Sequence, residues 1–190
     1  AAEYYRLSDR AQAMRKSGDL TAAIATWRQA LALNPNDDSG HNSLGVLLAT
    51  KGEFVAAETE FQTTLRLNPE FRDIHSNLAV SLAGQGRLDE AAAEFEKALA
   101  ADPRSIEAQN YYGRLLVRRG ETEKGIAHIR KALEIDSTYP SAHINLGMAL
   151  AQAGQLAEAK SEFERALESD PESAEAYNGL GLLAVRQGDM

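Results

Sequence analysis

Glycine recurs in this chain at a fixed interval of 34 residues. The members of the series are Gly18, Gly52, Gly86, Gly120, Gly154 and Gly188. Prolines at 35, 69, 103 and 171 follow the same interval. A strict period of this length is typical of repeat proteins, in which each short unit buries its apolar face only against its neighbours. The fold must therefore be built from copies of one small supersecondary element.

Counting from residue 4 gives repeats at 4–37, 38–71, 72–105, 106–139 and 140–173, followed by a partial repeat at 174–190. Each repeat predicts two helices, since apolar residues between Leu88 and Leu99 recur at the i, i+3, i+4, i+7 spacing of an amphipathic helix. The glycine at position 15 of each repeat is suited to a left-handed cap after the first helix. The proline at position 32 ends the second helix.

The repeat pattern predicts an all-α solenoid of five full helix-turn-helix repeats and one further helix. We expect residues 1–190 to form a single array that is a fragment of a longer protein. Position 20 is alanine in four repeats, and position 24 is aromatic in four repeats. A small residue beside a ring allows two helices to approach closely while the gap between them stays filled.

Composition excludes several classes of protein. The chain has no cysteine, so it has no disulfide framework, thiolate metal site or cysteine nucleophile. Its net charge of -8 opposes binding to a phosphate backbone, so we expect no nucleic-acid partner. No apolar run approaches the roughly 20 residues of a membrane span. We expect a soluble protein without a cofactor, with the cytoplasm the favoured compartment.

The repeat pattern resembles that of the tetratricopeptide repeat (TPR) family. The matching residues include the Leu-Gly pairs at 44–45, 146–147 and 180–181. Alanine, an aromatic residue and proline stand at the matching downstream positions in four of the five full repeats. The resemblance implies a right-handed superhelix whose first helices line a concave groove for peptides or partner proteins. The array is also similar to that of O-linked N-acetylglucosamine transferases, in which asparagines form a ladder along the groove.

Family geometry assigns positions 2, 5, 6, 9, 12 and 13 of each first helix to the groove. An asparagine side chain both donates and accepts hydrogen bonds, so it can satisfy the backbone of an extended peptide. The alternative is that these amides are solvated polar groups. The candidate groove residues are Asn42, Asn77, Asn110, Arg114, Arg118, Asn145 and Asn178.

The predicted ladder has gaps and one cationic pair. Ser43, Tyr111 and Gly179 occupy positions where the transferase pattern has asparagine, so that binding mode transfers only weakly. Arg114 and Arg118 lie one helical turn apart and could grip a carboxylate, although a solvated pair is the alternative. The residues of the chaperone-type carboxylate clamp are absent from the corresponding positions.

The fourth repeat departs from the pattern at four framework positions. It has Tyr112 for leucine, Gly125 for alanine, Ile129 for an aromatic residue and Ser137 for proline. These changes represent either tolerated drift or a local change of pitch, a hinge, between repeats 4 and 5. Glycine inside a helix costs about 1 kcal/mol relative to alanine. We therefore expect the amides of this repeat to exchange fastest among the interior repeats.

Two features resemble chemical sites. The stretch "GLGLLA" at 179–184 fits a dinucleotide-binding motif, but it follows no predicted strand. His41, His75 and His143 share position 4 and lie too far apart in stacked repeats to bind one metal ion, so we interpret them as framework residues standing in for an aromatic. No metal site is predicted, and we expect no enzymatic activity.

The last predicted helix has apolar residues on more than one face, at Leu180, Leu182, Leu183 and Val185. Such a helix is expected to dock onto something, so self-association is predicted. The leading hypothesis for function is a scaffold that binds an extended segment of a partner protein. One alternative is the substrate-recruiting region of a larger enzyme, such as a glycosyltransferase. The other is an architectural module that assembles through its terminal helices.

Overall fold

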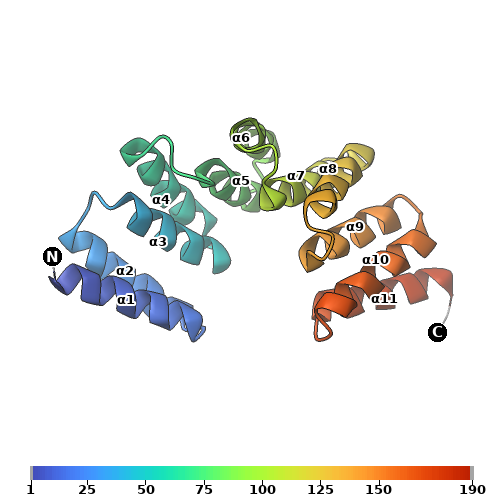
Figure 1. The fold of residues 1–190 in the computed structure, drawn as a ribbon, viewed down its shortest axis with the longest axis horizontal. Helices are drawn as coiled ribbons and strands as arrows, with labels where there is room; N and C mark the ends of the chain where they lie inside the picture. The colour runs from blue at the N-terminus through green and yellow to red at the C-terminus, as the bar shows by residue number, and fades with distance from the viewer. Residues whose placement is uncertain (1, 189–190) are drawn as a thin grey trace. The chain divides into compact units, whose positions relative to one another are not determined.

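The computed structural model describes residues 2–188, and this part of the chain contains helices and turns but no strand (Figure 1). The helices are α1 (Ala2–Lys16), α2 (Leu20–Leu33), α3 (Asp38–Thr50), α4 (Phe54–Leu67), α5 (Ile74–Gly84), α6 (Leu88–Ala101), α7 (Ile106–Arg118), α8 (Thr122–Ile135), α9 (Pro140–Gln152), α10 (Leu156–Ser169) and α11 (Ala174–Gln187). The all-α prediction is confirmed. None of the helices between residues 2 and 188 has the length and hydrophobicity that crossing a bilayer requires.

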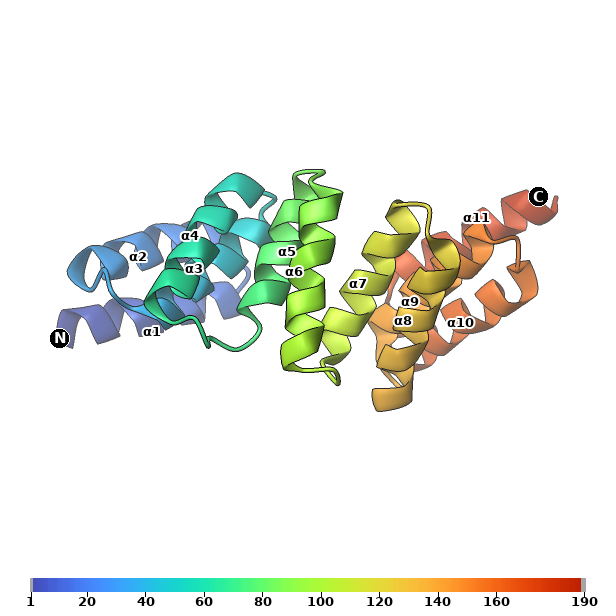
Figure 2. The ribbon, with the colours of Figure 1, turned by 90° about the horizontal axis from the view of Figure 1, so that it is seen from above.

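Two compact units divide the chain, unit 1 up to Glu94 and unit 2 from Phe95 onward, so their boundary lies inside α6. In unit 1, α1 packs against α2 and α3 against α4. In unit 2, α7 packs against α8 and α9 against α10, as Figure 2 also shows. We call the odd-numbered helices A helices and the even-numbered ones B helices, because each 34-residue repeat contributes one of each.

The periodic glycines end the A helices in a left-handed conformation. Gly120 has a φ of 85°, and the other five have φ between 79° and 83°. This region costs glycine nothing, whereas other residues are strained there. The chain then reverses, and the amide of Glu121 donates to the carbonyl of Leu116 at 2.9 Å. This closing hydrogen bond is the helix C-cap that the period predicts.

A buried ring beside a glycine fixes the contact between helices within a repeat. Phe61 and Phe163 are each 1% exposed. A Cβ added to Gly45 would lie 2.5 Å from the ring of Phe61, and one added to Gly147 would lie 2.8 Å from that of Phe163. The Leu-Gly pairs of the sequence are therefore a packing feature, in which the missing side chain makes room for the ring.

Repeat 4 packs its helices by a different pairing. A Cβ on Gly125 would lie 2.6 Å from the carbonyl oxygen of Gly113, and one on Gly113 would lie 2.5 Å from Ile129. Two glycines thus face each other where α7 meets α8, and Ile129, which replaces the ring, is fully buried. The smaller residue at position 24 is accompanied by a closer approach of the backbones. Two of the four departures in this repeat therefore compensate each other.

The turn at Ser137 keeps the geometry of the turns that contain proline. The amide of Thr138 donates to the Asp136 carboxylate at 2.9 Å, and the amide of Tyr139 donates to the Asp136 carbonyl at 3.3 Å. In the turn after α6, Arg104 and Ser105 make the same two bonds to Asp102. The bonds from the Thr138 amide and hydroxyl lower the pKa of Asp136. Pro140 begins α9, as the sequence predicts.

The core of unit 2 is continuous across the junction of repeats 4 and 5. It joins Ile126 and Ile129 of α8 to Ile144 and Leu146 of α9, and continues into α10 and α11. The hinge that the sequence suggested at this junction is not tested by the packing. The alternative, a turn that tolerates the loss of its proline, fits the retained hydrogen bonds.

Candidate functional site on the face of the first helices

The three histidines at position 4 tie each A helix to its surroundings. His143 Nδ1 lies 2.7 Å from Glu162 of α10, and its Nε2 lies 3.0 Å from the carbonyl oxygen of Ser137 in the preceding turn. His41 makes the same two contacts, with Glu60 at 2.6 Å and the Pro35 carbonyl at 3.0 Å. In both cases the two ring nitrogens lie against a carboxylate on one side and a backbone carbonyl on the other. These histidines are polar links and not only space-fillers.

His75 repeats the contact with a glutamate, at 2.6 Å from Glu94. Between residues 2 and 188, no group of three or more histidine, aspartate or glutamate side chains is placed to hold a metal ion. Each histidine is instead paired within its own repeat. The sequence carried a signal that could have revealed this role, because a glutamate follows each of the three histidines by 19 residues.

Repeat 4 makes the same link with the two side chains exchanged. Gln109 occupies position 4 and donates to the Pro103 carbonyl at 3.0 Å, while its amide oxygen lies 2.7 Å from Nδ1 of His128 on α8. Burial, followed by the positive charge of Lys131, lowers the pKa of His128 below its usual value. Tyr112 packs against the His128 ring at 4.8 Å between centroids. A neutral imidazole is therefore suited to this position.

Four of the five candidate asparagines form two hydrogen-bonded pairs between neighbouring A helices. In unit 1, Nδ2 of Asn77 on α5 donates to Oδ1 of Asn42 on α3 at 2.9 Å. In unit 2, Nδ2 of Asn145 on α9 donates to Oδ1 of Asn110 on α7, also at 2.9 Å. Each bond uses one donor and one acceptor, so each pair keeps further hydrogen-bonding capacity.

Asn110 differs from the wall residue that the sequence predicts. Its side chain is 0% exposed, whereas Asn42, Asn77 and Asn145 are partly exposed. Among the described side chains, its buried Nδ2 is one of two polar atoms without a hydrogen-bond partner. Asn110 therefore orients Asn145 from beneath and does not face the surface. The side chain of Asn145 is the more exposed member of the pair.

An aromatic and cationic cluster lies beside this pair on α7. The guanidinium of Arg114 lies over the ring of Tyr111, 5.2 Å from its centroid. Burial is the main cause that raises the pKa of Tyr139, and Tyr111 and Glu107 lie close enough to add to it. Arg114 and Arg118 are both exposed. Arginine stacked on tyrosine is common at protein interfaces.

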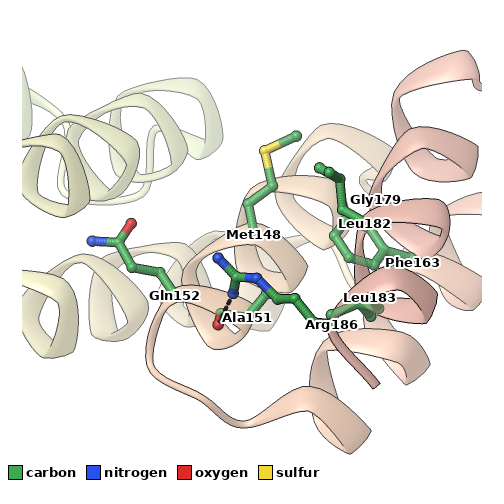
Figure 3. Close-up of a pocket in the computed structure, with 8 residues that line it drawn as sticks. All are labelled: Met148, Ala151, Gln152, Phe163, Gly179, Leu182, Leu183 and Arg186. Atoms are coloured by element: carbon green, nitrogen blue, oxygen red, sulfur yellow. Dashed lines mark hydrogen bonds between the residues drawn. The ribbon is translucent and has the colours of Figure 1, made fainter. Parts of the chain in front are cut away.

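An apolar pocket opens between α9 and α11, with a volume of about 410 Å³ (Figure 3). Figure 3 shows Met148 on α9 and Leu182 on α11 beside it, and Phe163 and Leu183 also line it. Nη1 of Arg186 donates to the carbonyl of Ala151 at 2.7 Å, which holds the guanidinium at the pocket. Met148, Ala151 and Arg186 occupy the predicted groove positions 9, 12 and 13.

The other predicted residues of α11 lie in different environments. Asn178, Leu182 and Val185 are exposed, the last two by 66% and 65%. Leu183 is buried and Leu180 packs against the core, so of the four apolar residues expected to mediate self-association only Leu182 and Val185 are exposed. The "GLGLLA" stretch lies wholly inside α11, and no strand precedes it in the described chain.

Helix pairs at a fixed interval, with the side chain at position 4 linked to the B helix in repeats 2 to 5, define an α-helical repeat protein. A family profile described as tetratricopeptide repeat matches residues 51–106, 76–140 and 144–190, and one described as TPR repeat matches residues 11–52. The chain belongs to the tetratricopeptide repeat family. Proteins of this family are in general scaffolds for protein interactions and not catalysts.

Solved structures of several proteins, two of them described as TPR proteins, resemble the fold. A thermophilic TPR protein of Thermus thermophilus is 20% identical, with a TM-score of 0.84 over 96% of this chain and 99% of that one. PilW, described as a type IV pilus biogenesis factor, is 22% identical, with a TM-score of 0.84 over 98% and 86%. YrrB, described as a TPR protein with an unusual peptide-binding site, is 19% identical, with a TM-score of 0.63 over 92% and 90%.

At these identities the likeness shows the fold alone. The chain matches none of the curated proteins with which it was compared.

Proposed function

We propose that the protein binds an extended segment of a partner protein along the face that the A helices form within a unit. One observation carries this proposal above the others. On a single face of unit 2, the partly exposed amide of Asn145 lies one helical turn before Met148 at the apolar pocket. Polar groups for a peptide backbone thus adjoin an apolar site for a side chain.

The asparagine pairs support recognition of a backbone. After its bond to Asn42, Asn77 retains a carbonyl oxygen and a second N–H, and Asn145 does the same after its bond to Asn110. The lateral bond also restricts the rotation of each amide, so less side-chain entropy is lost on binding. Backbone hydrogen bonds carry little sequence preference, and the cluster of Tyr111 and Arg114 would add preference for an acidic residue.

The family and one neighbour are consistent with this mode of binding. TPR folds take protein or peptide partners, and YrrB is described as having a peptide-binding site. The net charge of -8 disfavours nucleic acid as the partner, and we propose that the protein has no catalytic activity of its own.

The test is a peptide-display selection on the protein, compared with two double variants. Asn77→Ala/Asn145→Ala removes the amides, and Arg114→Glu/Arg118→Glu reverses the charges. We expect enriched peptides whose affinity falls about tenfold or more in at least one variant. The loss of one hydrogen bond to a charged group is enough for a decrease of this size. Exposed Arg130 of α8, as Arg130→Glu, serves as the control. Failure to enrich any peptide would overturn the proposal.

Self-association is a second candidate because α11 leaves two large apolar side chains in solvent. Leu182 and Val185 are among the most exposed large hydrophobic residues of the described chain, and Tyr177 on the same helix is 55% exposed. Helices of repeat proteins normally cover such residues with a neighbouring repeat. Another copy of the chain could cover them in the same way.

A further inference from the structure

The pocket between α9 and α11 occurs where the asparagine pairing is interrupted. The positions that hold Asn110 and Asn145 between α7 and α9 hold Ile144 and Gly179 between α9 and α11. A Cβ on Gly179 would lie 2.5 Å from the ring of Phe163. No side chain therefore covers the ring from this position, and the ring lines the pocket.

The walls of the pocket select an apolar group. Met148 and Leu182 are 46% and 66% exposed, and Leu183 and Phe163 lie buried behind them. Burying a large apolar side chain against such walls stabilises a complex, because the apolar surface of both partners is removed from water. Methionine is flexible and adapts to side chains of different shapes. The pocket therefore fits a leucine, isoleucine, methionine or phenylalanine side chain.

Arg186 adds a charge to this apolar site. Its bond to the Ala151 carbonyl uses one of five N–H donors and restrains the guanidinium beside the pocket. A restrained guanidinium is well suited to binding a carboxylate through two parallel hydrogen bonds. The complementary ligand therefore carries a negative charge close to its apolar side chain.

We infer that this pocket receives one large apolar side chain of a partner segment, and that Arg186 binds an aspartate or glutamate two residues away. The spacing follows because alternate side chains of an extended chain point to the same side. This inference rests on the proposed function and specifies the partner: an extended segment with an apolar and an acidic residue separated by one position.

The experiment uses a displayed library of random 12-residue peptides. We expect the enriched peptides to share the apolar and acidic residues at this spacing. A labelled peptide from that set should bind at least about tenfold more weakly to Ala151→Phe, which fills the pocket, and to Arg186→Gln. The matched control is Ala157→Phe, since Ala157 is an exposed alanine of α10, a B helix of the same unit that lies outside the A-helix face. Leu182→Asp is a second pocket variant that changes an exposed side chain, in case Ala151→Phe fails to fold.

The outcomes separate this inference from the proposed function. Peptides that lose affinity in the Asn77/Asn145 or Arg114/Arg118 variants, but not in the pocket variants, would support groove binding and overturn the pocket. Loss of affinity in the pocket variants, with Ala157→Phe unchanged, would establish it. Absence of any enriched peptide would count against both.

Discussion

His143 joins three pieces of the chain through the two nitrogens of one ring: its own helix, the turn before it and the B helix after it. Tyr177 makes the bond to the preceding turn in repeat 6, at 3.2 Å from the Pro171 carbonyl. The interpretation of position 4 as an aromatic framework position was therefore incomplete. In repeats 2, 4, 5 and 6 the carbonyl of the turn is the common partner, and the histidines add a bond to a glutamate.

The hydrogen bond between positions 143 and 162 should survive when its two side chains are replaced by the pair found in repeat 4. His143→Gln alone places an amide against the largely buried Glu162 carboxylate and should lower the free energy of unfolding by about 1–3 kcal/mol. His143→Gln/Glu162→His reproduces the pairing of Gln109 with His128 and should recover most of the loss. Urea unfolding measures both. If the double variant lost as much free energy of unfolding as the two single variants together, the pairing would not have been restored.

His128 predicts a dependence of stability on pH. Because burial lowers its pKa, the unfolded chain takes up a proton at this residue before the folded chain does. Its contribution is present above the ordinary histidine pKa of about 6.5 and is lost as the pH falls through the folded value. The stability of the protein relative to His128→Gln should therefore decrease between about pH 8 and pH 5. A difference that stays constant or grows in acid would oppose this.

Burial was the property of single residues that the sequence could not predict. Asn42 and Asn110 share one register position, yet the first is partly exposed and the second is fully buried. Leu182 and Leu183 are adjacent on a helix, and only the first is exposed. Such differences depend on which neighbouring side chains cover a position, and the repeat pattern contains no such information.

The close packing of α7 against α8 requires glycine at position 125, although glycine has a low helix propensity. Gly125→Ala gains about 1 kcal/mol of helix propensity, but its Cβ meets the Gly113 carbonyl, and overpacking costs about 1–3 kcal/mol. We expect a net loss of stability. Gly181→Ala in α11 is the matched control, because nothing lies within 4 Å of its added Cβ, and it should be stabilising. If thermal unfolding showed that both substitutions raise the melting temperature, the close contact between α7 and α8 would be contradicted.

That the amides of repeat 4 exchange fastest among the interior repeats stays a prediction. The propensity of Gly125 favours fast exchange, whereas its close packing opposes it. Comparison of α7 and α8 with the other interior helices decides which effect is larger.

The turn between α8 and α9 should accept the missing proline. Asp136 before it has φ of -134° and ψ of 99°, the extended conformation that proline requires of the preceding residue. Asp170 before Pro171 is similar, with φ of -136° and ψ of 86°. Ser137→Pro should thus raise the free energy of unfolding by about 0.4–1 kcal/mol, by restricting the unfolded chain.

The neighbouring residue provides the control for this substitution. Thr138→Pro removes the amide that donates to Asp136 and should destabilise the protein. If Ser137→Pro and Thr138→Pro changed the free energy of unfolding in urea equally, this turn would differ from the turns that contain proline.

Helices and turns were the elements that the sequence predicted well. Their signals are local, because glycine caps, prolines and apolar spacing act within a few residues. The pocket could not be predicted in this way, since it arises from Gly179, Met148 and Phe163 on three different helices. The sequence shows that Gly179 has no side chain, but it does not show that the ring of Phe163 on α10 is thereby left open to the pocket.

At the scale of the whole molecule, the exposed residues of α11 predict association. Sedimentation should show a species larger than the monomer that dissociates on dilution, and Val185→Asp should shift it toward monomer. Val55 on α4 is equally exposed, at 68% against 65%, so Val55→Asp tests whether any surface charge has this effect. A protein that stays monomeric at high concentration, or that responds equally to both substitutions, would oppose association through α11.

The asparagine pairs recur after two repeats and not after one, since Asn42 and Asn110 are 68 residues apart, as are Asn77 and Asn145. Asn178 stands at the same interval after Asn110. For anyone engineering longer versions, the module to copy is therefore a double repeat. Each pair takes one asparagine from position 5 of one repeat and the other from position 6 of the next, so a single repeat cannot supply a whole pair. Each added double repeat would bring one more pair, so that reach along a ligand and avidity would increase in steps of two.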